Sequence, residues 1–138
     1  MYKTIIDHAP SQAANNVIKE GLFAAHKDII GEPDKHFSVF LKNDLGKIAG
    51  GIMAFFDTES VYIDALWVDE TLRNQGYGKK LLKAAEQEGI NHGCVFSTTD
   101  TWDFQAEGFY LKNGYERMGE IKNYWFNHSR IFLRKNLK

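Results

Sequence analysis

Apolar residues recur at helical spacing in three parts of the chain, and this spacing predicts a helix in each. In the second part Tyr77, Leu81 and Ala85 share one face, while charged residues take the other faces. The predicted helices cover residues 11–28 with a break near Gly21 as an alternative, the segment from residue 77 to a stop at Gly89, and residues 104–113 with a stop at Gly114. A loop is expected over residues 31–35.

Apolar runs bounded by turn residues predict strands around these helices. The predicted strands cover residues 2–6, 37–41, 48–55, 60–68, 94–98, 115–121 and 129–134, with a hairpin turn at 43–46. The strand, helix, strand order across residues 60–98 requires a right-handed crossover and a parallel pair. The predicted fold class is therefore α/β (α+β): a mixed, mostly antiparallel twisted sheet of six or seven strands with about four helices on both faces.

The most distinctive segment is an apolar strand that runs through Arg73-x-x-Gly76-x-Gly78 into the second predicted helix. The first N–H groups of a helix have no partner within it, and the helix dipole favours negative charge there. Lys79 and Lys80 would oppose that dipole, which is favourable only if an anion binds nearby. The segment therefore predicts a phosphate site, with an ordinary glycine turn as the alternative.

These residues resemble a known family. Arg73-Asn-Gln-Gly-Tyr-Gly78 is similar to the Arg/Gln-x-x-Gly-x-Gly/Ala loop of the GNAT superfamily of N-acetyltransferases, which binds the pyrophosphate of acetyl-coenzyme A. Residues 62–68 and 94–97 resemble the family's fourth and fifth strands, and residues 106–115 resemble its Ala-x-x-x-Tyr-x-x-x-Gly-Phe/Tyr segment. The resemblance covers residues 60–137. It implies that the parallel pair splays apart and that acetyl-coenzyme A is the co-substrate.

The resemblance also implies which residues bind the cofactor. The loop would hold the pyrophosphate, and the pantetheine arm would pair with the open edge of the strand before it. The predicted cofactor-binding residues are Leu66, Trp67, Val68, Arg73, Asn74, Gln75, Gly76, Tyr77, Gly78 and Lys79. Asp103 stands where many relatives have an asparagine that contacts the cofactor, so it either makes that contact or caps the following helix.

Acyl transfer from a thioester to an amine requires a proton acceptor for the amine, donors for the oxyanion and an acid for the departing thiolate. The resemblance implies that Tyr110 is the acid, and a phenol with an ordinary pKa near 10 stays protonated at neutral pH. The alternative is a tyrosine that packs with Phe109 against the sheet. Main-chain N–H groups near residues 66–68 are expected to stabilise the oxyanion.

Asp64 is the predicted catalytic base. It interrupts an apolar strand, where an unpaired charge on an inward face costs several kcal/mol and so suggests a purpose. The strand period of two places Asp64 on one face with Tyr62 and Leu66. If water covers that face, Asp64 is an ordinary surface residue, and this alternative stays open.

Composition narrows the function. The chain has 138 residues with 43% hydrophobic content, which predicts a single domain over residues 1–138. A formal net charge of −1 and the lack of a long apolar run predict a cytoplasmic protein that binds neither nucleic acid nor membranes. Five histidines without ligand spacing predict no metal site. Cys94, the single cysteine, is expected to be a buried thiol rather than a nucleophile.

The sequence therefore predicts an acetyl-coenzyme A-dependent N-acetyltransferase that acts by direct attack of a primary amine of a small molecule or peptide. The alternatives are a non-catalytic acyl-coenzyme A-binding module and a plain phosphate or nucleotide binder. Aromatic and acidic residues near predicted strand ends suit a cationic acceptor. They are Phe55, Phe56, Trp67, Trp102 and Trp125, with Asp57, Glu59, Asp100 and Asp103. A homodimer, as many relatives form, is left open.

Overall fold

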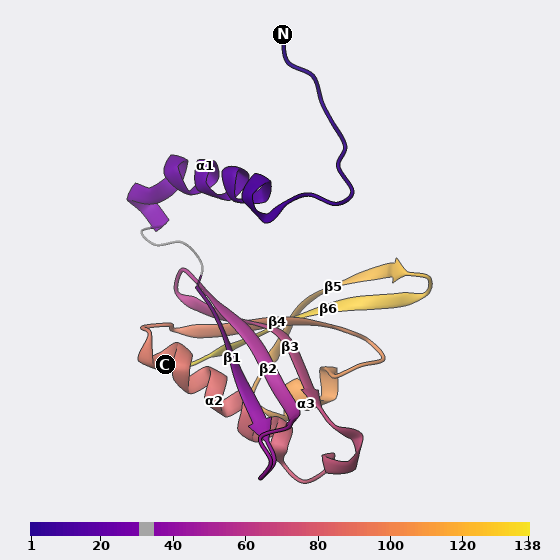
Figure 1. The fold of residues 1–138 in the computed structure, drawn as a ribbon. Helices are drawn as coiled ribbons and strands as arrows, with labels where there is room; N and C mark the ends of the chain where they lie inside the picture. The colour runs from indigo at the N-terminus through magenta and orange to yellow at the C-terminus, as the bar shows by residue number, and fades with distance from the viewer. Residues whose placement is uncertain (31–34) are drawn as a thin grey trace. The chain divides into compact units, whose positions relative to one another are not determined.

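The structure is a computed structural model that describes residues 1–30 and 35–138, and these residues fall into two units (Figure 1). The first unit contains the helix α1 (Gln12–Ile30), which is continuous through Gly21, so the alternative of a break is wrong. Ser11 caps its start, because Ser11 Oγ accepts a hydrogen bond from Ala14 N at 3.0 Å.

Two other predictions concern this part of the chain. Residues 2–6 form no strand, and that prediction is wrong. These residues are exposed and none of the described strands pairs with them, whereas a strand needs a partner for its N–H and C=O groups. The predicted loop at 31–35 lies outside the described residues except for Lys35. A single domain over residues 1–138 stays a prediction.

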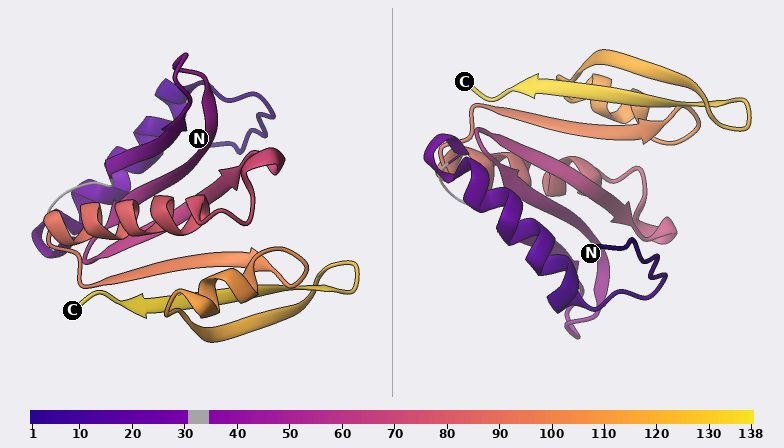
Figure 2. Two further views of the ribbon diagram at one scale, coloured as in Figure 1. Left: turned by 90° about the horizontal axis from the view of Figure 1, so that it is seen from below. Right: turned by 90° about the horizontal axis from the view of Figure 1, so that it is seen from above.

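The second unit is built on a six-stranded sheet with the order β1-β2-β3-β4-β6-β5 (Figures 1 and 2). β3 and β4 form its one parallel pair, and the other neighbours are antiparallel. The predicted mixed, mostly antiparallel sheet is therefore confirmed. The strands are β1 (Lys35–Lys42), β2 (Ile48–Asp57), β3 (Ser60–Val68), β4 (Phe96–Trp102), β5 (Glu116–Trp125) and β6 (His128–Asn136).

Two α-helices, α2 (Tyr77–Asn91) and α3 (Glu107–Lys112), lie on the same face of this sheet (Figure 2). With α1, the described residues contain three α-helices, and the short 3-10 helix η1 (Glu70–Leu72) precedes α2. The expected number was about four. Coverage of the second face of the sheet stays a prediction. The core between α2 and the sheet contains Leu82, Ala85, Ile52, Val61, Ile63, Ile131 and Leu133.

The prediction that α2 stops at Gly89 is wrong, because the helix continues to Asn91. Gly89 lies inside α2, where a Cβ atom would come within 2.8 Å of Val61 Cγ1. The glycine thus permits close packing of α2 on β3. The turn after the helix comes at Gly93, whose φ of +90° belongs to the left-handed region.

The other predicted elements are present with boundaries that differ by a few residues, and two of these differences concern β4 and α3. β4 starts at Phe96 rather than at residue 94, and Cys94 lies before it with its N–H bonded to Gly89 O at 2.8 Å. Cys94 is fully buried, as predicted, and burial raises the pKa of its thiol. α3 is shorter than expected, but Gly114 follows its end with φ +92°, as predicted.

The parallel pair splays apart, which confirms the expectation from the resemblance. Pairing of β3 with β4 runs from Ser60 opposite Phe96 to Ile63 opposite Thr99 and stops there. The ladder between β2 and β3 shifts at the same level, which leaves Asp64 as an extra residue in a β-bulge.

The bulge changes which side chains of β3 reach the core. Ile63 is buried before it, and after it Leu66 and Val68 pack against the same core, while Trp67 is exposed. The prediction that Asp64 and Leu66 share a face was therefore wrong, because the bulge interrupts the period of two.

Replacement of Gly89 with alanine tests the close packing of α2 on β3. Gly89→Ala should lower the free energy of unfolding by about 1–2 kcal/mol, because overpacking against Val61 outweighs the gain of about 1 kcal/mol in helix propensity. Gly108→Ala, in α3 with no atom near the new Cβ, should raise it by about 0.5–1 kcal/mol. Urea unfolding measures both, and a stabilised Gly89→Ala protein contradicts the packing.

Candidate active site

A pocket of about 290 Å³ opens where β3 and β4 diverge. Its walls come from the end of β3, the end of β4, the segment leading into α3, α3 itself and β6. Both predicted catalytic residues, Tyr110 and Asp64, line it. The full lining is Asp64, Ala65, Leu66, Thr99, Asp100, Thr101, Trp102, Gln105, Ala106, Tyr110 and Arg130.

The buried Tyr110 side chain packs edge-on between Phe109 and Tyr115, with ring centroids 5.2 Å away in each case. Burial raises the pKa of its phenol, the charge of Asp100 adds to the shift, and a hydrogen bond with Thr99 opposes it. The phenol therefore stays protonated at neutral pH. The packing described by the alternative is therefore present, and it leaves a phenol that can donate a proton; the role of Tyr110 as the acid stays a prediction.

Asp64 projects from the bulge and is exposed at the pocket. Among the described residues it makes no hydrogen bond and no ion pair. Its carboxylate is therefore available to a molecule that enters the pocket, and of the two alternatives that the sequence left open, the structure shows the exposed one.

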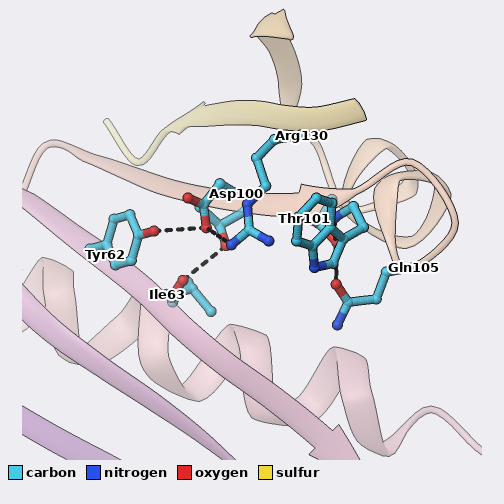
Figure 3. A network of polar contacts seen from close by, with 8 residues as sticks. Tyr62, Ile63, Asp100, Thr101, Gln105 and Arg130 are labelled. Atoms are coloured by element: carbon cyan, nitrogen blue, oxygen red, sulfur yellow. Dashed lines mark hydrogen bonds and ion pairs between the residues drawn. The ribbon is translucent and has the colours of Figure 1, made fainter. Parts of the chain in front are cut away.

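A second carboxylate, Asp100, stands on the opposite strand and is held by two donors (Figure 3). Its Oδ1 accepts hydrogen bonds from the Tyr62 hydroxyl at 2.8 Å and from Arg130 Nη2 at 3.1 Å. The Arg130 guanidinium also lies over the Trp102 ring, 4.6 Å from its centroid. The sequence indicated Asp100 and Trp102 as acceptor-site candidates, but it gave no reason to select Arg130.

Side-chain hydrogen bonds fix the strands at the mouth of the pocket (Figure 3). Thr99 Oγ1 donates to Ile63 O at 2.9 Å, across the last rung between β3 and β4. Thr101 Oγ1 donates to Gln105 Oε1 at 3.1 Å, which holds the segment leading into α3 against the end of β4. The pocket therefore lies between two strands whose separation begins at a defined point.

The predicted anion loop leads from β3 into α2. Arg73 Nε donates to Val68 O at 3.2 Å, which ties the loop to the strand end. Gly76 adopts φ +83° at the N-cap of α2, and no side chain caps the helix. The N-terminal amides of α2 are thus left to an external partner, and the exposed Lys79 adds positive charge beside them. This loop fits a pyrophosphate group.

The strand segment predicted to pair with pantetheine also fits that role. Beyond Ile63 the inner edge of β3 has no partner in β4, while its outer edge stays paired with β2 as far as Val68. Leu66, Trp67 and Val68 therefore lie along an open strand edge, whose main-chain groups can pair with an amide-containing ligand.

Asp103 has a different role from the predicted cap. α3 begins after Ala106, with no side-chain cap, so that prediction was wrong. Asp103 Oδ2 accepts a hydrogen bond from Ser129 N at 2.9 Å, and Oδ1 lies 3.0 Å from His128 Nδ1. The Ser129 amide, and then His128, lower the pKa of Asp103. Both oxygens thus bind the start of β6, and contact with the cofactor stays a prediction.

Comparison with known proteins agrees with this geometry. The model of the acetyltransferase (GNAT) family matches residues 3–115. The chain belongs to the GNAT family. It is 34% identical to blasticidin-S acetyltransferase of Streptomyces morookaense over 93 residues, which cover 67% of this chain and 68% of that protein. It is 28% identical to an acetyltransferase of Agrobacterium fabrum over 118 residues, 85% of this chain and 86% of that one.

A solved structure extends the likeness over nearly the whole chain. The crystal structure of an acetyltransferase from Bacillus cereus matches with a TM-score of 0.81 and 32% identity, and it covers 99% of both chains. GNAT acetyltransferases use acetyl-coenzyme A. This chain is accordingly an acetyl-coenzyme A-dependent acetyltransferase. The comparisons therefore favour an enzyme over the alternative of a non-catalytic binding module.

Most of the aromatic and acidic residues proposed for acceptor binding lie elsewhere in this acetyltransferase. Phe56 stacks on His92 with centroids 3.9 Å apart, and Phe55 stacks on Tyr62 at 5.0 Å. Of the predicted set, Trp102 and Asp100 line the pocket. Within residues 1–30 and 35–138, no cluster of His, Cys, Asp and Glu could hold a metal ion, and no helix is long and apolar enough to cross a membrane.

A buried polar network, which the sequence did not reveal, connects α2 to the half of the sheet formed by β4, β6 and β5, on the far side of the gap from β3. The Tyr115 hydroxyl lies 2.8 Å from both Glu86 Oε2 and Ser97 Oγ, and Lys135 Nζ donates to Glu86 Oε1 at 2.9 Å. Burial raises the pKa of Tyr115, whose ring packs against Tyr110. The network therefore fixes the position of Tyr115, whose ring supports the pocket-lining Tyr110.

Removal of the Tyr115 hydroxyl tests this support. Tyr115→Phe should lower the free energy of unfolding by about 1–3 kcal/mol, because the buried Glu86 carboxylate loses a donor. Tyr124→Phe, at an exposed position on β5, should change it by less than about 0.5 kcal/mol. Urea unfolding of both variants measures the difference, and equal stabilities would show that the network contributes nothing.

Proposed function

We propose that this protein transfers the acetyl group of acetyl-coenzyme A to a primary amine of a small molecule or peptide, by direct attack and without a covalent enzyme intermediate. One observation carries the proposal: the protonated Tyr110 phenol and the unpaired Asp64 carboxylate line the same pocket, beside the open edge of β3. A proton donor and a proton acceptor at one site are what aminolysis of a thioester requires.

Cofactor binding would use the residues that the sequence indicated. The α2 amides after Gly76, with Arg73 and Lys79 nearby, would hold the pyrophosphate. The open edge formed by residues 66–68 would align the pantetheine arm along β3. Acetyl-coenzyme A supplies the activated acyl group when it is bound.

The two catalytic side chains would move protons in opposite directions. Asp64 would accept a proton from the acceptor ammonium, which frees its lone pair to form the C–N bond. Tyr110 would donate its phenolic proton to sulfur as the C–S bond breaks. Exchange with solvent would then return both side chains to their starting states. Main-chain N–H groups near residues 66–68 are the candidates for oxyanion stabilisation.

The acceptor is proposed to be cationic and small, or to present one end to the pocket. The charged lining consists of Asp64, Asp100 and Arg130, so two carboxylates stand against one guanidinium and the net charge is negative. Because a relative is a blasticidin-S acetyltransferase, blasticidin S belongs in the first acceptor screen, beside simple alkylamines and peptides.

Tyr110→Phe tests the acid role. The phenylalanine keeps the packing against Phe109 and Tyr115 but removes the donor, so kcat should fall by about 100-fold or more. The dissociation constant for acetyl-coenzyme A should stay the same. Because burial raises the pKa of Tyr110, wild-type activity should not decline on the alkaline side until above about pH 10. Steady-state kinetics measure both effects, with Tyr124→Phe as the control variant. Full activity of Tyr110→Phe would refute the role of Tyr110 as the acid.

A pair of glycine substitutions tests the pyrophosphate loop. Gly76 (φ +83°) and Gly46 (φ +79°) both have open space around a new Cβ, so alanine at either position should cost about 1 kcal/mol in folding stability. Only Gly76→Ala should weaken coenzyme A binding, by about tenfold, because it disturbs the amides at the start of α2. Isothermal titration calorimetry measures this, and equal affinities of the two variants count against the loop.

A further inference from the structure

Two carboxylates occupy equivalent places on the diverging strands. Asp64 follows Ile63, and Asp100 follows Thr99, the last residues that pair between β3 and β4. Both line the pocket, and both lie close enough to the Tyr62 hydroxyl to affect it. Burial, the hydrogen bond to Asp100 and then the charge of Asp64 raise the pKa of Tyr62. A ligand in the gap would therefore meet one carboxylate from each strand.

Arg130 makes these two carboxylates different. It stands directly opposite Trp102 in the ladder between β4 and β6, and its guanidinium covers the Trp102 ring. From there Nη2 reaches Asp100 Oδ1, which Tyr62 also binds. About a quarter of the Arg130 side chain and a fifth of the Asp100 side chain are exposed, so the pair is partly shielded from water. Asp64 has no such partner among the described residues.

The pairing has two consequences for a cationic ligand. The charge of Asp100 is balanced by a guanidinium in the same pocket, which leaves Asp64 as the carboxylate that an ammonium group can bind. Arg130 also occupies the face of Trp102, which would otherwise offer a second cation a favourable place. The pocket thus offers one carboxylate, Asp64, to a ligand cation. The Arg130 guanidinium occupies the place beside Asp100 and Trp102 that a second ligand cation would take.

We propose that Arg130 is a specificity-determining residue, which restricts the acceptor to amines that carry a single positive charge in the pocket. The inference rests on the proposed function, since it concerns the acceptor of that reaction. Loss of Arg130 would expose Asp100 and the Trp102 face, and the pocket would then accept diamines. Arg130 touches Asp100 and Trp102 and is not a catalytic residue.

Binding of two probes of equal length tests this inference separately from activity. The dissociation constants of n-butylamine and 1,4-diaminobutane are measured by NMR titration of the full chain in the presence of coenzyme A, and their ratio is compared between variants. A change of one unit in pocket charge acts once on the monocation and twice on the dication. Arg130→Gln should therefore favour the diamine by about tenfold relative to wild type.

Substitution of the partner should have the opposite effect. Asp100→Asn leaves Arg130 unbalanced and should disfavour the diamine by about tenfold. The double variant Arg130→Gln/Asp100→Asn restores the wild-type pocket charge, so its ratio should return to within about twofold of wild type. Arg134→Gln removes a guanidinium from the same strand, where it lies over Phe96, and should leave the ratio unchanged.

The outcomes separate the inference from the proposed function. An unchanged ratio in Arg130→Gln, or the same direction of change in Asp100→Asn, overturns the inference even if amines are acetylated. If Arg130→Gln does not fold, Asp100→Asn and the double variant still decide, because the double variant removes both charges of the Arg130–Asp100 pair and leaves neither without its partner. Absence of acetyl transfer to every amine in the screen would refute the proposed function, while the binding ratios would still test Arg130.

Discussion

The separation of β3 and β4 beyond the Ile63–Thr99 rung is the constraint on which the site depends. β3 stays paired with β2 on its outer side as far as Val68, and β4 stays paired with β6 as far as Trp102. Each strand is therefore held from outside while its inner edge is open. Unpaired strand edges are normally a liability in a sheet, and here one of them is the edge proposed to bind the pantetheine arm.

The helix α2 joins the two halves of the sheet, β1-β2-β3 on one side of the gap and β4-β6-β5 on the other. Ala85 and Gly89 belong to the face of the helix that packs on β3, and Gly89 allows the helix to approach Val61 closely. From the same helix, Glu86 binds Tyr115 and Lys135, which belong to the other half. A buried carboxylate is favourable only with such partners, and this one fixes the position of the second half relative to the helix. The helix that follows the predicted anion loop is thereby tied to both sides of the gap.

The sequence predicted the features that arise from local chemistry. The strand, glycine loop and helix between residues 60 and 91 appear in the structure because their signals, apolar alternation and glycines at turns, act over a few residues. Residues 2–6 look like a strand locally, but strand formation depends on a partner elsewhere. Gly89 looked like a helix stop, since sequence does not distinguish a glycine that ends a helix from one that allows close packing.

The bulge at Asp64 is a feature of the site that local sequence signals likewise did not predict. A period of two predicts faces only while the ladder is regular, and one extra residue exchanged the faces of Leu66 and Trp67. Tyr110 and Asp64, each in or beside a family motif, line one pocket, and their catalytic roles stay predictions. Arg130 was missed because β6 carries no motif and its partner, Asp100, is 30 residues away. The motif segments of this acetyltransferase thus hold the proposed catalytic residues, whereas the charged lining of the pocket is completed by Arg130 from a strand that the motifs do not reach.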